Sequence, residues 1–443
     1  MATWAAPAAA HPVLKRSIPA ANDTLRSVPA QFHLEFNKVL LARLTTVELR
    51  MPGGETVRLR ADSGSTRAEL VLSGYATLSS GSYQLAWQVA GDDGHPVRGS
   101  LKFVVDLQKQ IDSVPATPGA AAVHHPADLF PPTPSIEDEG GFQVQSPGYV
   151  AVRWVTFLAL LTLVGTLTFR ALVWPRLPDW RPATLPRLRV LGLGAAALLL
   201  ISALARLWAQ AAATAMQGEP IALDLIDALL LHSPWGIGWW LQVFGALVVA
   251  ISLLRSANKA MRWMIAGIGA LMAVAAMPMS GHAAAVEGFG PLPMFADALH
   301  VIGAGSWLGT LLALLVAGVP VTRTLAAGNR TDALARLVTA FSPVALSAAA
   351  LVATTGVFAA WVHLGSIDAL WAGGYARVLL IKLGVLSLVV ATGAYNWRVV
   401  RPALLRGQED APIARSAGFE LAIGAIVIAV TAVLVATPPA MTP

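Results

Sequence analysis

The chain has 443 residues, is 56% hydrophobic, carries a formal net charge of +6 and contains no cysteine. The lack of cysteine excludes disulfide bonds and thiolate metal sites, so a metal site must use histidine, methionine, carboxylate or a terminal amine. Residues 11–106 have the composition of a soluble domain, whereas long apolar runs dominate from residue 148 onward. This combination predicts a membrane protein with a water-soluble head. The positive charge comes mostly from arginines near the ends of the apolar runs, so it reports on membrane topology and does not indicate nucleic-acid binding.

The first ten residues, MATWAAPAAA, fit the remnant of a signal peptide. Ala8 and Ala10 match the small-x-small pattern of a signal-peptidase site, and cleavage there makes His11 the mature N-terminus. The stretch has no basic n-region and is short for an h-region. The alternative interpretation is a disordered alanine-rich tail.

Short runs of alternating apolar and polar residues follow in the region 11–106. The pattern occurs at 32–36, 83–89 and 101–105, and turn sequences such as PGG at 52–54 separate the runs. A period of two is typical of half-buried strands. The region is therefore predicted to form a small antiparallel β-sandwich or barrel.

The stretch AGDDGHPVRG joins the last two of these runs. Asp93 offers oxygen and His95 offers imidazole nitrogen, and Gly94 between them keeps the loop compact. Cu(II) favours a tetragonal set of nitrogen and oxygen ligands. An Asp-x-His pair alone is more often a pair of solvated turn residues. If cleavage exposes His11, however, its α-amine and imidazole can chelate the same ion.

The runs HPVLKRSIPAANDTLRSVPAQFHLEFNKVL and GSYQLAWQVAGDDGHPVRGSLKFVV make residues 11–105 similar to the periplasmic copper-binding CopC proteins. The resemblance implies a cupredoxin-like Greek-key fold and a Cu(II) site formed by His11, Asp93 and His95. Some members also carry a methionine-rich loop for Cu(I). Residues 52–215 contain no methionine, so no Cu(I) site is expected in the head.

Residues 107–147 are rich in proline, alanine and acidic residues and show no core periodicity. This composition predicts an extended, flexible linker. His124 and His125 lie within it, and two solvated histidines are the simpler interpretation of this pair than a metal site.

Eight apolar runs have the length of about 20 residues that a membrane span requires. The segment 221–232 is too short and too acidic to span, and it is predicted to be an amphipathic helix at the membrane interface. The predicted spans are 148–174, 188–213, 235–254, 261–279, 294–319, 340–362, 377–397 and 418–437.

Lysine and arginine gather in the loops after the first, third, fifth and seventh spans, and Arg377 is the exception. Positively charged short loops stay in the cytoplasm, so both termini lie outside. We expect a multi-pass protein of the bacterial inner membrane with its N-terminal domain and C-terminus in the periplasm.

The histidines of the membrane region all fall on the predicted outer side. Asp297 and His300 are three residues apart and share a helix face. Imidazole with carboxylate suits Cu(II), imidazole with thioether suits Cu(I), and ionisable groups at membrane depth are candidates for function. Met277 and Met279 are equally well explained as core or lipid-facing residues. The candidate metal ligands are His282, His300, Asp297, Met277, Met279, Met294 and His363.

Two further polar residues, Lys382 and Asn396, lie in the predicted seventh span. A lysine at membrane depth needs a partner or must extend to the interface. Both residues are also explained by helix packing.

The stretches SGHAAA, ADALHVIGAGSWLG, FSPVALSAAALVATTGVFAAW and YARVLLIKLGVLSLVVATGAYN follow in this order. They make the region 148–437 similar to the CopD family of copper resistance membrane proteins. The whole chain therefore resembles a CopC–CopD fusion. The expected parts are a signal-peptide remnant (1–10), a CopC-like Cu(II)-binding β domain (11–106), a linker (107–147) and a CopD-like membrane domain of eight helices (148–443).

Three functions fit these features. In the first, a non-enzymatic one, the head captures Cu(II), alone or from periplasmic copper chaperones, and delivers it to or across the lipid bilayer. Import fits better than export because every candidate ligand faces outward. The second is a haem-binding electron-transfer protein or cupric reductase, with His300 and either His282 or His363 as axial ligands. The third is periplasmic copper sequestration by an anchored head. The chain has no nucleotide-binding loop, which argues against ATP-driven pumping.

Overall fold

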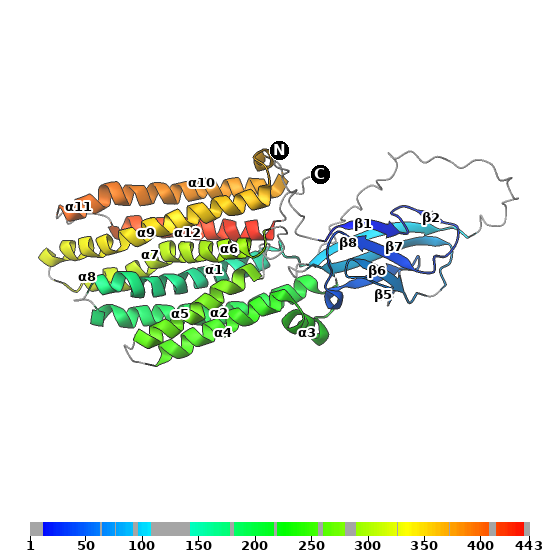
Figure 1. Ribbon diagram of the computed structural model, residues 1–443, viewed down its shortest axis with the longest axis horizontal. Coiled ribbons are helices and arrows are strands. Elements are labelled where there is room, and N and C mark those ends of the chain that lie inside the picture. The colour runs from blue at the N-terminus through cyan, green and yellow to red at the C-terminus, as the bar shows by residue number, and fades with distance from the viewer. Residues whose placement is uncertain are drawn as a thin grey trace. The chain divides into compact units, whose positions relative to one another are not determined.

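The computed structural model describes residues 12–62, 64–75, 77–91, 96–107, 142–177, 181–216, 219–255, 260–279, 289–325, 327–371, 373–406 and 413–437. The chain divides into two compact units, an all-β unit and a helical one (Figure 1). We call them the head unit, which also includes residues 211–233, and the helical unit, which includes residues 143–210 and the chain from Pro234 onward. The predicted fold class, a β domain followed by an all-α membrane bundle, is confirmed.

One curled eight-stranded sheet forms the head unit, in the order β1-β3-β6-β5-β4-β7-β8-β2. Strand β7 returns to lie beside β4, so β4 to β7 follow a Greek-key path. The first part of β5 pairs with β4 and its last residues pair with β6, which joins the two halves of the sheet. The strands are β1 Leu14–Ile18, β2 Thr24–Leu25, β3 Phe32–Phe36, β4 Thr46–Arg50, β5 Thr56–Ala61, β6 Glu69–Ser73, β7 Gly81–Ala90 and β8 Pro96–Val105.

The alternating residues form the core of the head unit, as the sequence predicts. Leu34, Leu85 and Val89 are completely buried, whereas their polar neighbours His33, Glu35 and Gln84 are more exposed and Gln88 is buried. Gly99 of β8 is required by this packing, because a Cβ there would lie 2.5 Å from the Trp87 ring of β7. The Trp87 side chain of β7 thus packs directly against β8, the strand that begins within the AGDDGHPVRG stretch.

Eight helical segments in the described part of the chain are long and apolar enough to cross a membrane. This number confirms the eight predicted spans, but several helices extend beyond the apolar runs. The sixth, predicted over 340–362, covers Asn329–Leu364, because the backbone stays helical through its arginine-containing end. The segments are Pro147–Arg176, Pro182–Thr214, Pro234–Leu254, Ala260–Met279, Leu292–Thr322, Asn329–Leu364, Gly373–Leu405 and Ile413–Ala436.

Three of these segments change helix type along their length. The first contains α1 (Pro147–Thr168) and a π-helical turn, η4 (Phe169–Val173). The fifth and seventh contain further π-helical turns. The fifth runs through α6 Leu292–Ala304, η8 Gly305–Gly309, α7 Thr310–Ala313, η9 Leu314–Gly318 and α8 Val319–Thr322, and the seventh through α10 Gly373–Tyr395, η11 Asn396–Val400 and α11 Arg401–Leu405. The other long helices are α2 Arg181–Thr214, α4 Pro234–Leu254, α5 Ala260–Met279, α9 Ala327–Leu364 and α12 Ile413–Ala436.

Glycines bring α1 and the fifth segment into backbone contact. A Cβ on Gly165 would lie 1.9 Å from the carbonyl carbon of Gly309, and a Cβ on Gly309 would lie 1.9 Å from the carbonyl oxygen of Leu161. Gly305 precedes Gly309 by four residues, the spacing of small residues that lets membrane helices approach closely. No side chain fits at this crossing.

The short helix α3, Leu223–Leu231, belongs to the head unit. Its Ala228 and Leu229 are buried in a cluster with Leu44 and Ala90 of the β domain. The sequence predicts an interfacial helix over 221–232. The helix exists, but its buried face packs against protein, a partner that hydropathy does not reveal.

We expect Gly309→Ala to destabilise the helical unit. The added methyl group meets backbone atoms of α1, and overpacking of this kind lowers the free energy of unfolding by about 1–3 kcal/mol or more. Gly267→Ala is the matched control, because a Cβ on that α5 glycine has no heavy atom within 4 Å. Thermal unfolding of the two purified variants in detergent tests this expectation. Equal melting temperatures would contradict the close crossing.

Candidate functional site

The three predicted Cu(II) ligands of the head, His11, Asp93 and His95, lie outside the described residues. The two strands that carry the loop are described, and they pair along their whole length from Gly81↔Val105 to Ala90↔Pro96. The Asp93–His95 loop therefore connects the ends of a continuous antiparallel hairpin.

This hairpin holds the end of helix α2. Arg98 of β8 donates hydrogen bonds to the carbonyl oxygens of Ala213 (3.1 Å) and Ala215 (2.7 Å). Gln88, its cross-strand partner, accepts a bond from Arg98 Nε and donates to the carbonyl of Thr214. The last carbonyls of a helix lack intrahelical partners and carry partial negative charge, so a guanidinium satisfies and stabilises them. The strand that leaves the predicted metal loop is thereby fixed to the last turn of α2.

Ion pairs join residues 43 and 58 of the β domain to the segment 219–232. Arg58 of β5 lies 3.4 Å from Glu219, and Arg43 lies 3.7 Å from Asp227, which also pairs with His232 at 3.4 Å. All of these side chains are partly exposed, so each pair contributes modestly. Glu219 and Asp227 thus have cationic partners in the β domain.

Burial and the carboxylate of Glu219 raise the pKa of Glu48 on β4, while Arg58 and Arg50 oppose the shift. A raised pKa in the folded state means that the folded protein binds the proton more tightly than the unfolded chain. Stability therefore falls as the pH rises through this raised pKa. Ionised Glu48 is a small electrostatic cost of the head unit at neutral pH.

In the helical unit, Asp297 and His300 lie on α6, as predicted, and share an environment. Lys382 of α10 interacts electrostatically with both side chains. His300 Nδ1 lies 2.9 Å from the Thr355 hydroxyl oxygen of α9, and that hydroxyl donates its own proton to the Leu351 carbonyl at 2.6 Å. The hydroxyl oxygen is thus left to accept a proton from Nδ1, a tautomer in which Nε2 carries the lone pair that a metal ion requires.

The other described candidate ligands of the helical unit lie on α5, on α9 and in the first turn of α6. Met277 is buried in the hydrophobic core at the end of α5, and Met279 ends that helix. Met294 lies in the first turn of α6. His363, near the end of α9, packs edge-on against the Tyr375 ring at 6.0 Å. His282 lies outside the described residues, and among the residues that are described no three acidic or histidine side chains gather as a metal site.

Two buried polar clusters escaped the sequence analysis. Glu420 of α12 is 4% exposed and accepts hydrogen bonds from Trp307 and Asn396. Arg206 of α2 is 6% exposed and donates to Gln242 of α4. Each is a single charged residue in an apolar run, and its partners come from distant segments. The charge within a predicted span is the only signal that the sequence contained.

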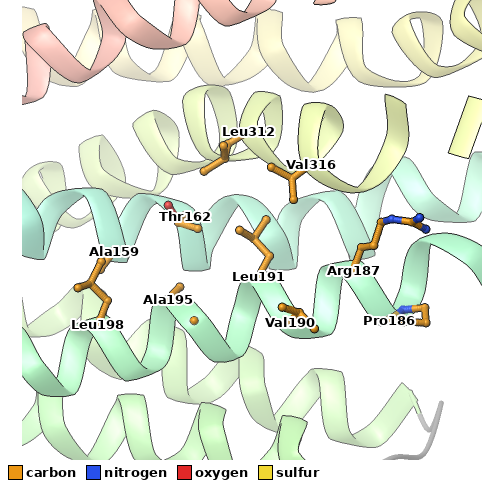
Figure 2. A pocket seen from close by; sticks show the side chains of 11 residues that line it. Ala159, Thr162, Pro186, Arg187, Val190, Leu191, Ala195, Leu198, Leu312 and Val316 are labelled. Atoms are coloured by element: carbon orange, nitrogen blue, oxygen red, sulfur yellow. The ribbon is translucent and has the colours of Figure 1, made fainter. Parts of the chain in front are cut away.

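An apolar groove of about 590 Å³ lies between α1, α2 and the α7–η9 part of the fifth segment (Figure 2). Thr162 and Arg187 are the polar residues of its wall. The other lining side chains include Leu191, Leu198 and Val316. This wall offers no histidine, carboxylate or thioether, so the groove is not a metal site.

Comparisons with known proteins cover both units. The CopC domain matches residues 14–106, the N-terminal domain of copper resistance protein D-like proteins matches 144–291, and copper resistance protein D matches 335–434. The chain is 26% identical over 445 residues to the copper transport protein CutJ of Bacillus subtilis (strain 168), which covers 97% of this chain and 74% of that protein.

The head alone has relatives of its own. Copper resistance protein C of Xanthomonas campestris pv. juglandis is 39% identical over 107 residues, covering 23% of this chain and 84% of that protein. The crystal structure of CopC from Methylosinus trichosporium OB3b is 24% identical, with a TM-score of 0.20, and covers 22% of this chain and 94% of that one.

We expect Arg98→Ala to loosen the end of α2. The change removes charge-assisted hydrogen bonds to helix-terminal carbonyls, interactions worth roughly 1.5–3 kcal/mol each. Hydrogen exchange of the full chain should show faster exchange in residues 211–216. Arg16→Ala, which removes an exposed arginine from β1, is the control. Unchanged exchange in this segment would contradict the role of Arg98.

We expect Glu48→Gln to stabilise the head unit at neutral pH, because it removes the cost of the ionised carboxylate. The gain should shrink as the pH falls through the raised pKa and vanish below the ordinary value of 4.5. Denaturant unfolding at a series of pH values measures it, with Glu55→Gln in the exposed β4–β5 turn as the control. A gain that is constant with pH would exclude ionisation as its cause.

Proposed function

Because the chain belongs to the CopC–CopD family, a CopC domain joined to a CopD membrane domain, we propose that it captures Cu(II) in its head and delivers it to or across the bacterial inner membrane. It is a multi-pass membrane protein of copper resistance and transport. Import is the direction we propose, with the head and the C-terminus in the periplasm and periplasmic copper chaperones as donors.

The observation that best supports delivery is the contact between the β7–β8 hairpin and α2. The proposed Cu(II) loop joins the two strands of this hairpin, and Arg98 bonds to the carbonyls of Ala213 and Ala215, where the chain leaves α2 within the head unit. If metal binding changed the conformation of the loop, the change would act on β7 and β8. These two strands also bond to residues 213–215 through Gln88 and Arg98.

For the head site we propose His11, Asp93 and His95 as the Cu(II) ligands. The α-amine and imidazole of His11 supply nitrogen, Asp93 supplies oxygen and His95 supplies a further nitrogen, a set that suits tetragonal Cu(II). We propose residues 11–106 as the binding domain and residues 107–147 as its linker to the membrane domain at 148–443.

For the membrane domain we propose that copper binds to imidazole and thioether groups. The lone pair on His300 Nε2 is available in the tautomer that Thr355 selects. Asp297 is the oppositely charged partner of Lys382, and it remains a proposed ligand beside His300. Imidazole and thioether ligands favour Cu(I). The remaining proposed ligands are His282, His363, Met277, Met279 and Met294.

We expect His95→Ala to weaken Cu(II) binding by roughly 100-fold. Changes to residues that only support a metal ligand typically cost about 10–100-fold in affinity, and loss of the ligand itself should cost at least as much. Electron paramagnetic resonance of the full chain, titrated with Cu(II), measures both affinity and ligand type. His33→Ala is the matched control, because His33 is a head histidine paired with Glu69 on β6.

A mature chain extended by one alanine before His11 tests the amine ligand in the same titration. We expect the extension to weaken Cu(II) binding while leaving His95 in place. Unchanged binding in both the His95 variant and the extended chain would overturn the proposed head site. A haem absorption band in the purified protein would instead favour the electron-transfer alternative.

A further inference from the structure

Glu420 is a carboxylate buried where three segments of the helical unit meet. It lies about 10 Å along α12 from the start of that helix. Its Oε1 accepts a hydrogen bond from Trp307 Nε1 at 3.1 Å, and its Oε2 accepts one from Asn396 Nδ2 at 3.0 Å. The side chain is 4% exposed. Both oxygens therefore have one partner each, and each partner comes from a different segment.

These partners are neutral, and within the described part of the chain no cationic side chain forms an ion pair with Glu420. A buried charge is costly unless it is paired, so a carboxylate in such surroundings marks a functional site. Helices α1, α7 and α10 and the turns η9 and η11 pack against α12, and α7 and η9 carry no titratable residue. The charged and titratable groups on these helices and on α12 itself are Tyr149, Arg153, Tyr375, Arg377, Lys382, Tyr395, Arg398 and Arg415.

The surroundings fit a proton better than a metal ion. The indole Nε1–H of Trp307 is a donor only, and it points at Oε1, so it cannot serve as a ligand to a cation. Asn396 Oδ1 is buried and has no hydrogen-bond partner among the described residues. A protonated Glu420 would supply the O–H donor that this oxygen lacks, after a half-turn of the Asn396 amide.

The two donors occupy irregular turns of their helices. Trp307 lies in the π-helical turn Gly305–Gly309, and Asn396 begins the π-helical turn Asn396–Val400. Such turns are rare and occur frequently at functional sites. Two π-helical turns thus each donate a hydrogen bond to Glu420. This observation supports a functional site independently of the burial of the carboxylate.

We propose that Glu420 is a proton-binding site inside the membrane whose occupancy is coupled to copper movement. A proton from water binds to Oε2, and the Asn396 amide turns to accept the new O–H on Oδ1. Release reverses both steps, and no electron is transferred. His300 lies on α6 and Trp307 on its continuation η8, about 10 Å apart along the axis. Copper bound at His300 and a proton bound at Glu420 beside Trp307 would therefore act on the same helical segment. The coupling rests on the proposed transport function, but the proton site does not.

Infrared difference spectroscopy of the full chain without copper tests the proton site. We expect acidification to produce a protonated-carboxyl band that shifts in D₂O and is lost in Glu420→Gln. Trp307→Phe should shift the band, because it removes the donor to Oε1. Asp332→Asn, which removes an exposed carboxylate paired with Arg336, should retain it. If Glu420→Gln fails to fold, Glu420→Asp replaces it and should move the band. A band unchanged in the Glu420 variant, or absent from the wild type, would overturn the site.

Copper flux into proteoliposomes with and without a pH gradient tests the coupling. We expect the gradient to change the wild-type rate and to have no effect on Glu420→Gln. A Glu420→Gln rate that follows the gradient as the wild-type rate does would overturn the coupling. If the wild type moves no copper at all, the transport proposal fails, while the infrared band still decides whether Glu420 binds a proton.

Discussion

The inability of hydrocarbon to hydrogen-bond polar groups governs the helical unit of this protein. Polar side chains inside the membrane must find partners within the protein, on their own helix or on another one. Glu420 meets Trp307 and Asn396, and Arg206 meets Gln242. These contacts, together with the glycine crossings that bring helix backbones together, determine which helices are neighbours. The same polar contacts mark the places where the unit can bind ions or protons.

The head unit meets the same requirement at a helix end. The last turn of α2 exposes carbonyl groups that Arg98 and Gln88 satisfy from β8 and β7. Because the proposed copper loop joins these two strands, the same hairpin carries this loop and satisfies the carbonyl groups at the end of α2. These hydrogen bonds lie within the head unit, between the hairpin that carries the proposed copper loop and residues 213–215.

Periodicity and hydropathy predicted most of the fold. Alternation located β3, β7 and the second half of β8 because one face of the sheet is buried, and apolar length found all eight spans. Helix ends were missed because arginine-containing turns, as in the sixth span, continue the backbone hydrogen bonds without raising hydropathy. The partners of α3 were missed because Leu44 and Ala90 are far away in the sequence.

The candidate site was predictable only in part. The shared face of Asp297 and His300 follows from helix geometry, but their electrostatic interaction with Lys382 of α10 depends on how the helices are arranged in the bundle. Glu420 appeared as a single acidic residue near the start of the last span, and only the fold shows that two π-helical turns enclose it. The ligands His11, Asp93 and His95 remain predictions.

Copper uptake by proteoliposomes in which the head faces outward tests the central claim most directly. External Cu(II) should enter the lumen and become inaccessible to an external chelator, and the double variant Asp93→Ala/His95→Ala should slow this entry. Copper that binds the wild-type protein but stays fully removable from outside, as it would on an anchored head, would contradict delivery across the membrane.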